Sequence, residues 1–84
     1  MGAQPRPQPN RLAGKLKTIR ENLGLSQEQM VDRLQSVPCP PNRSMISRFE
    51  TGQREPSLLV LLEYSRMTGI STDILIDDKL NLPK

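Results

Sequence analysis

The 84-residue sequence contains no histidine and a single cysteine, Cys39. Histidine is the commonest general base and metal ligand near neutral pH, so its absence argues against most hydrolytic and metal-dependent chemistry. One thiol cannot form an internal disulfide or a thiolate metal cluster. A paired acid site and a Gly-rich phosphate loop are also missing. The sequence therefore predicts no metal, no cofactor and no enzymatic activity.

Long apolar runs are missing as well. The longest, residues 58–62, is far shorter than the roughly 20 apolar residues that span a bilayer. The first ten residues, MGAQPRPQPN, are polar and Pro-rich and lack the apolar stretch of a secretory signal. We therefore expect a protein of the reducing cytoplasm, with no membrane partner.

The net charge of +3 is unevenly distributed along the chain. Basic residues without any acid occupy the first twenty positions: Arg6, Arg11, Lys15, Lys17 and Arg20. The C-terminal third carries five acids against three bases; the acids are Glu55, Glu63, Asp73, Asp77 and Asp78. A basic N-terminal part and an acidic C-terminal part suit a protein that binds a polyanion through one face. An ordinary solvated surface can have the same charge distribution.

Apolar residues recur every three or four positions in five segments, and no segment alternates as a strand would. The expected helices are 11–23, 27–35, 43–51, 58–68 and 72–76. Each of the last four follows a residue that commonly caps helices, namely Ser26, Asn42, Ser57 and Ser71. Ser26 also has glutamine three residues later, which predicts a capping box.

The same spacing predicts the buried side chains. They are Leu12, Leu16, Ile19 and Leu23 in the first helix, Met30, Val31 and Leu34 in the second, Ile46 and Phe49 in the third, and Leu58, Leu61, Leu62 and Ser65 in the fourth. We expect an all-α fold, a compact bundle of five short helices over residues 11–77. A Pro-rich arm, 1–10, precedes it, either as a mobile tail or as a DNA-seeking arm through Arg6. A loose tail, 78–84, follows it.

Two capped helices in tandem, the second with a polar outer face, are typical of a helix-turn-helix. The segments LGLSQEQMVDRL and MISRFETGQREPSLLVLLEYSRMTGISTDIL resemble the Cro/C1-type (XRE-like, phage-repressor-like) helix-turn-helix family over about residues 12–76. The resemblance implies a lambda-repressor-like domain that binds double-stranded DNA as a transcriptional regulator. A repressor, acting as a homodimer on two half-sites, is expected.

The third helix carries the residues expected to read bases. A helix in the major groove presents its N-terminal residues to base edges. Arginine can bind guanine O6 and N7 with two hydrogen bonds, and serine can donate or accept. The resemblance implies base contacts by Arg43, Ser44 and Arg48, with Ser47 adjacent. Composition alone allows the alternative that these residues are exposed and bind nothing.

Phosphate contacts are expected at two places. Gln27 begins the second helix, where free backbone N–H groups suit a phosphate. The resemblance implies that it anchors the DNA backbone and braces the recognition helix, while a capping role stays open. The turn after the third helix either follows phosphates or only joins two helices; its candidate residues are Thr51, Gln53 and Arg54. The resemblance also implies that Arg20 pairs with Glu50 in a structural role.

The turn between the second and third helices departs from the family pattern. The turn, residues 35–41, is about five residues longer than usual. It contains three prolines and lacks the usual glycine. The insertion is either tolerated or a stiff loop that contacts phosphates, a partner or a second subunit. An exposed Cys39 thiol there would be open to modification.

Two further alternatives remain open from the sequence. The same fold can serve as a protein-interaction module, such as an antitoxin-type protein with secondary DNA binding. A group of apolar residues near the C-terminus can supply either a dimer contact or part of the core: Ile74, Leu75, Ile76, Leu80 and Leu82.

Overall fold

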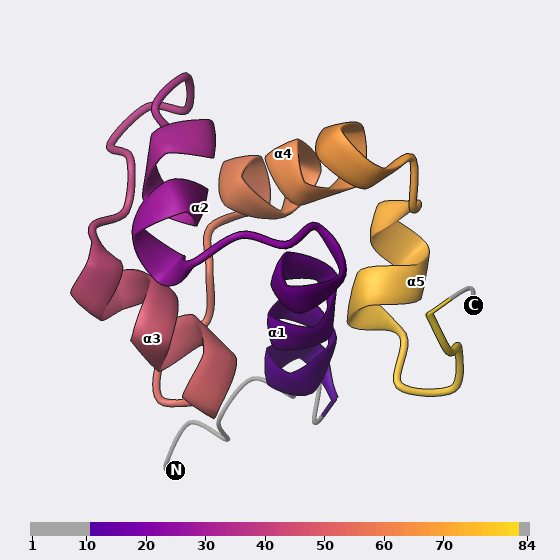
Figure 1. Cartoon of the computed structure of the whole chain (residues 1–84). Coiled ribbons are helices and arrows are strands. Elements are labelled where there is room, and N and C mark those ends of the chain that lie inside the picture. The colour runs from indigo at the N-terminus through magenta and orange to yellow at the C-terminus, as the bar shows by residue number, and fades with distance from the viewer. Residues whose placement is uncertain (1–10, 83–84) are drawn as a thin grey trace, which may run out of the picture.

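The computed structural model describes residues 11–82, which form five helices and no strand (Figure 1). The helices are α1 (Leu12–Asn22), α2 (Gln27–Arg33), α3 (Arg43–Thr51), α4 (Leu58–Thr68) and α5 (Thr72–Ile76). The all-α prediction is confirmed, and α3, α4 and α5 have the expected bounds. Helix α2 ends earlier than expected, because residues 34–36 turn out of the helix.

Most of the predicted caps form. The Ser26 hydroxyl accepts from the Gln29 backbone N–H at 3.1 Å, and the Gln29 side chain accepts from the Ser26 N–H at 2.8 Å. This is the reciprocal capping box predicted from the sequence. Asn42 and Ser57 each accept from the backbone N–H three residues later, whereas Ser71 makes no side-chain cap bond. Local polar side chains thus fix where three of the helices begin.

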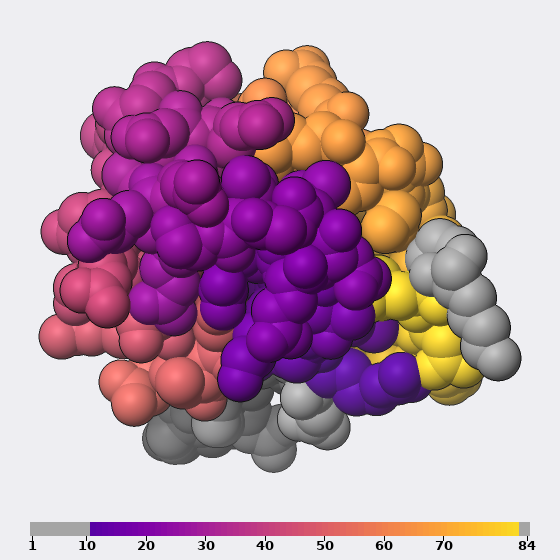
Figure 2. Space-filling view, viewed as in Figure 1, coloured from indigo at the N-terminus to yellow at the C-terminus, as the bar shows by residue number. Residues whose placement is uncertain are grey.

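Helix α1 lies at the centre of the arrangement. It packs against α3 on one side and α5 on the other, α2 packs against α3, and α4 packs against α5. In Figure 2, α1 and the connection to α2 lie in the middle of the visible face, with α2 and α3 to the left and α4 and α5 to the right. The core between them consists of twelve buried apolar residues: Leu12, Leu16, Ile19, Met30, Leu34, Val37, Ile46, Phe49, Val60, Leu61, Tyr64 and Leu75.

The buried face of α4 differs from the prediction. Leu61 is buried as expected, but Leu58 is 80% exposed and Leu62 is 36% exposed. The helix buries Val60 and Tyr64 instead. Five consecutive apolar residues, 58–62, satisfy a helical stripe in more than one rotation, so periodicity alone cannot select the inner face. The face of α4 that turns inward carries Tyr64, the largest side chain of the helix.

The end of α1 also differs from the prediction. Leu23, expected in the core, is the C-cap residue of the helix and is 41% exposed. Gly24 then adopts a left-handed conformation with φ of +71°, which turns the chain away. Leu25 packs against the core beyond this turn.

Lys15 is buried in the middle of α1, which the sequence did not predict. It is 4% exposed, and its Nζ donates to the backbone oxygens of Ile74 at 2.6 Å and Asp77 at 2.9 Å. These carbonyls lie at the C-terminal end of α5, where the helix dipole favours a cation. Lys15 therefore ties a helix of only one and a half turns to α1.

We expect Lys15→Met to lower the free energy of unfolding by about 1–2 kcal/mol, because two carbonyls lose a charged donor while the apolar stem is kept. Urea unfolding measures the difference, and Lys17→Met is the matched control, because Lys17 is exposed on the same helix. Equal stability of the two variants would contradict a role for the Lys15 ammonium group.

The segment after α5 is held to the start of α1. The Arg11 backbone N–H donates to Asp78 Oδ1 at 3.0 Å, and the Arg11 guanidinium donates to the Asp78 carbonyl and to Asn81 Oδ1. Leu82 packs against the core. The expected loose tail is therefore not found in residues 78–82. The prediction for the 1–10 arm lies outside the described residues, as do residues 83–84.

Tyr64 has an unusual hydroxyl environment. The side chain is fully buried, and its hydroxyl oxygen has no hydrogen-bond partner among residues 11–82. Burial, and next the negative charge of Glu50, raise the pKa of the Tyr64 phenol well above its ordinary value of 10.0. The Tyr64 phenol of the folded protein therefore stays neutral at pH values at which the phenol of the unfolded chain is ionised.

This environment predicts a pH dependence of stability. Below pH 10 the phenol is neutral in both the folded and the unfolded state, so its ionisation does not lower the free energy of unfolding. Above pH 10 the phenol ionises in the unfolded state, which stabilises that state and lowers the free energy of unfolding. We expect the wild type to lose about 1.4 kcal/mol per pH unit above pH 10 relative to Tyr64→Phe. At pH 7 the variant should be as stable as the wild type or up to about 1 kcal/mol more stable. Denaturant unfolding at pH 7, 9 and 11 measures this, and parallel pH profiles of the two proteins would refute it.

Candidate nucleic-acid interface

Helix α3 separates its polar and apolar residues onto opposite faces. Ile46 and Phe49 are buried against the bundle. Arg43, Ser44 and Arg48 are exposed, and Ser47 is half-buried beside them; these are the four predicted base-reading residues. The structure thus brings all four to the outer part of one helix, anchored by its apolar side.

Helix α3 ends in a tight turn. Gly52 has φ of +79°, a left-handed conformation that strongly favours glycine. The backbone N–H groups of Gln53 and Arg54 both donate to the carbonyl of Arg48, at 2.9 and 3.2 Å. The Thr51 hydroxyl donates to the same carbonyl at 3.3 Å. The predicted phosphate-contacting residues of this turn are exposed and held close to the end of α3.

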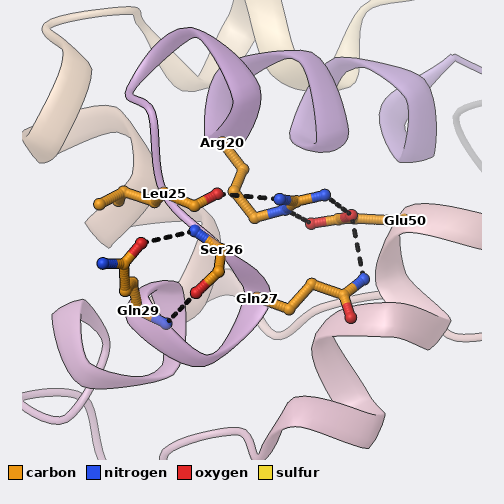
Figure 3. Close-up of polar contacts among 6 residues, drawn as sticks. All are labelled: Arg20, Leu25, Ser26, Gln27, Gln29 and Glu50. Carbon is orange, nitrogen blue, oxygen red and sulfur yellow. Dashed lines mark hydrogen bonds and ion pairs between the residues drawn. The ribbon is translucent and has the colours of Figure 1, made fainter.

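Arg20 of α1 and Glu50 of α3 form the predicted pair (Figure 3). Arg20 Nε donates to Glu50 Oε2 at 2.7 Å, and Nη2 donates to Oε1 at 3.0 Å, a two-bond arrangement. The Glu50 side chain is 3% exposed and that of Arg20 is 14% exposed. The hydrogen bond to Glu50, and its negative charge, raise the pKa of Arg20. The Arg20 guanidinium therefore stays charged in a largely buried position.

The same pair holds the start of α2. Arg20 Nη1 donates to the carbonyl of Leu25 at 2.9 Å, just before α2 begins. Gln27 is half-buried, and its Nε2 donates to Glu50 Oε1 at 3.4 Å (Figure 3). Glu50 therefore joins α1, the N-terminus of α2 and α3 through side chains alone. This network agrees with the expectation that Gln27 braces α3.

The lengthened turn between α2 and α3 folds back onto the bundle. Val37 is 7% exposed and Pro41 is fully buried, while Pro38, Cys39 and Pro40 are exposed. Cys39 has φ of +52°, so the chain reverses there through a conformation that is strained for a side-chain-bearing residue. The insertion is thus an ordered part of the fold, and Figure 1 shows it descending from the end of α2 to the start of α3.

The outer face of α3 and its turn carry positive charge. Arg43, Arg48 and Arg54 are exposed, and within residues 11–82 none of their guanidinium groups pairs with a carboxylate. In the same range, no three acidic or thiol side chains are grouped as a metal site would require. No helix of this range is long and apolar enough to cross a membrane. The arrangement offers several cationic and hydroxyl donors on one rigid helix.

Comparison with known proteins gives two findings. A family model described as a helix-turn-helix domain matches residues 11–76. The SPbeta prophage-derived uncharacterized HTH-type transcriptional regulator YonR of Bacillus subtilis (strain 168) is 36% identical over 62 residues, which cover 74% of this chain and 53% of that protein. The chain thus spans about half the length of this relative.

Proposed function

Because the chain belongs to the helix-turn-helix domain family, we propose that it binds double-stranded DNA sequence-specifically and regulates transcription. The observation that carries the proposal is the outward face of α3, which bears two serines and two arginines that pair with no carboxylate within residues 11–82, on a helix fixed by its buried side. A helix with such a face fits the major groove, which is wide enough to admit it.

In the proposed complex, the N-terminal half of α3 enters the major groove. Arg43 and Arg48 bind guanine edges, and Ser44 and Ser47 complete the readout with shorter hydrogen bonds. Because these residues span fewer than two helical turns, one copy can read only a few base pairs. We therefore propose a homodimer that reads two half-sites about one turn of DNA apart.

Phosphate contacts on either side of α3 orient it in the groove. Gln27 uses one amide hydrogen for Glu50, which leaves the other for a phosphate. Thr51, Gln53 and Arg54 meet the backbone at the opposite end of α3. Bound in this way, the protein occludes the DNA that it covers, so we propose that it acts as a repressor.

Selection of bound sequences from random duplex DNA, followed by sequencing, tests this function. We expect enrichment of one short, two-fold symmetric sequence. Affinity for the enriched duplex should fall steeply between 50 and 200 mM salt, because phosphate contacts release counterions. No enriched sequence, together with salt-insensitive weak binding, would refute DNA reading and favour a protein-interaction module.

A further inference from the structure

Four cationic side chains lie on α1 and at its N-cap, and three of them are engaged within the fold. Arg11 is bound to the segment after α5, Lys15 to backbone carbonyls at the end of α5, and Arg20 to Glu50. Lys17 is exposed and makes no hydrogen bond or ion pair within residues 11–82. Its ammonium group is therefore available to an anion outside the fold.

Lys17 lies on the edge of α1 that faces α3. It is four positions after Ala13 and three before Arg20, so these three residues form one stripe of the helix surface. Ala13 lies against the turn after α3, since a methyl group placed on Gly52 would be 3.9 Å from the Ala13 Cβ. Arg20 is bound to Glu50 near the end of α3 (Figure 3). Lys17 thus lies between two contacts of α1 with the C-terminal part of α3.

This stripe joins the two places where phosphate contacts are proposed. At one end, Arg20 and Glu50 hold the start of α2, where Gln27 lies. At the other end, Ala13 adjoins the turn of residues 51–54. The two ends are seven residues apart on α1, so the stripe is about 10 Å long. One strand of DNA carries a phosphate per about 3.4 Å of helix axis, so a strand that meets both ends has further phosphates between them.

We infer that Lys17 contacts a phosphate of the bound DNA, between those reached by Gln27 and by the turn of residues 51–54. The inference rests on the proposed function. A lysine ammonium group binds phosphate as a point charge on a long flexible stem, so it can follow a strand while the stem stays on α1. Glu21, four positions later, forms no ion pair with Lys17 that would compete with the phosphate.

This contact makes α1 a part of the interface. The phosphate-binding edge then runs without a gap from the start of α2, along α1, to the turn after α3. Because phosphates carry no sequence information, Lys17 adds affinity for every duplex by about the same factor. Lys17 is therefore a positioning residue, which orients α3 in the groove and does not read bases.

Salt dependence tests the contact, because Lys17→Met keeps the apolar stem and removes the charge. We expect Lys17→Met to weaken binding to the selected and the random duplex alike, by about 3- to 10-fold at 50 mM salt. The slope of the logarithm of the association constant against the logarithm of salt concentration should become less steep by about 0.9 for each bound copy. The loss should therefore be about threefold smaller at 200 mM salt. Lys17→Arg, which keeps a cation, should leave both quantities close to those of the wild type.

Lys79→Met is the matched control for the loss of one lysine. Lys79 is exposed in the segment after α5, and α5 lies across α1 from α3 (Figure 1). Its removal should leave the salt slope unchanged. Equal slopes for Lys17→Met and Lys79→Met would overturn the inference and leave the proposed function standing. A wild type that selects no sequence and binds without salt dependence would instead contradict the proposed function itself.

Neutral methylphosphonates, placed one at a time in the selected duplex, locate the phosphate. We expect one position in each half-site at which the substitution weakens binding of the wild type but not of Lys17→Met, because the variant has already lost that contact. Every other position should weaken both proteins equally. If the two proteins respond alike at every position, Lys17 binds no phosphate and the inference is wrong.

Discussion

Glu50→Ala is expected to lower the free energy of unfolding by about 3–5 kcal/mol, because it leaves the Arg20 guanidinium charged and largely buried without its partner. The carboxylate receives two bonds from Arg20 and one from Gln27, so three donors lose their acceptor at once. For a domain of this size the loss corresponds to a decrease in Tm of roughly 12–40 °C. Since small domains are stable by about 5–15 kcal/mol, the variant should be partly unfolded at 37 °C.

Two comparisons identify the cause of this loss. Glu28→Ala removes an exposed acid and should cost less than about 1 kcal/mol. The double variant Arg20→Met/Glu50→Leu removes both charges and should regain most of the lost stability, since apolar replacement of a buried pair is often neutral. Thermal unfolding followed by circular dichroism measures all three. A Glu50→Ala protein as stable as Glu28→Ala would show that the pair contributes little.

The helix starts could be predicted from the sequence because their causes are local. Ser26 and Gln29 are three residues apart, and the capping box needs no contact from elsewhere in the chain. The same holds for Asn42 at the start of α3 and for Gly24 after α1. A cap is decided by residues within one turn, so its pattern in the sequence is sufficient.

Burial on α4 could not be predicted in the same way. Leu58 and Tyr64 are both apolar and both lie on the helix, yet one is 80% exposed and the other fully buried. The choice depends on how α4 meets the rest of the bundle, which involves residues far away in the sequence. Lys15 shows the same limit, since its partners lie 59 and 62 positions further along the chain.

In the candidate interface, some features follow from neighbouring residues in the sequence and others depend on residues far apart in the sequence. The outward position of Arg43 and Ser44 follows from the apolar spacing of Ile46 and Phe49 on the same helix. The pairing of Arg20 with Glu50 came from family resemblance, because nothing in the spacing links positions 30 residues apart. The packing of the lengthened α2–α3 turn against the bundle through Val37 and Pro41 could not be predicted, since loop length alone does not determine the path of a loop.

Arg43→Ala is expected to weaken binding to the selected duplex by about 5- to 150-fold per half-site, since a bidentate arginine–guanine contact is worth about 1–3 kcal/mol. Arg43 is exposed at the N-terminus of α3 and pairs with no carboxylate within residues 11–82, so the fold should tolerate its removal. Fluorescence anisotropy with labelled duplexes measures the affinity. Repeated selection with the variant should give a sequence in which one guanine position per half-site is relaxed.

Arg66→Ala is the matched control for the loss of one positive charge. Arg66 lies on α4, its side chain is 68% exposed, and its 3.8 Å pair with Glu63 is a surface contact of small energetic value. Arg66→Ala should weaken binding to the specific and the random duplex slightly and equally. Arg43→Ala should weaken binding to the specific duplex far more than binding to the random one. Equal effects of the two variants on both duplexes would mean that Arg43 supplies only general charge. Base reading would then rest on Arg48 and the two serines, and α3 would enter the groove by a later turn than we propose.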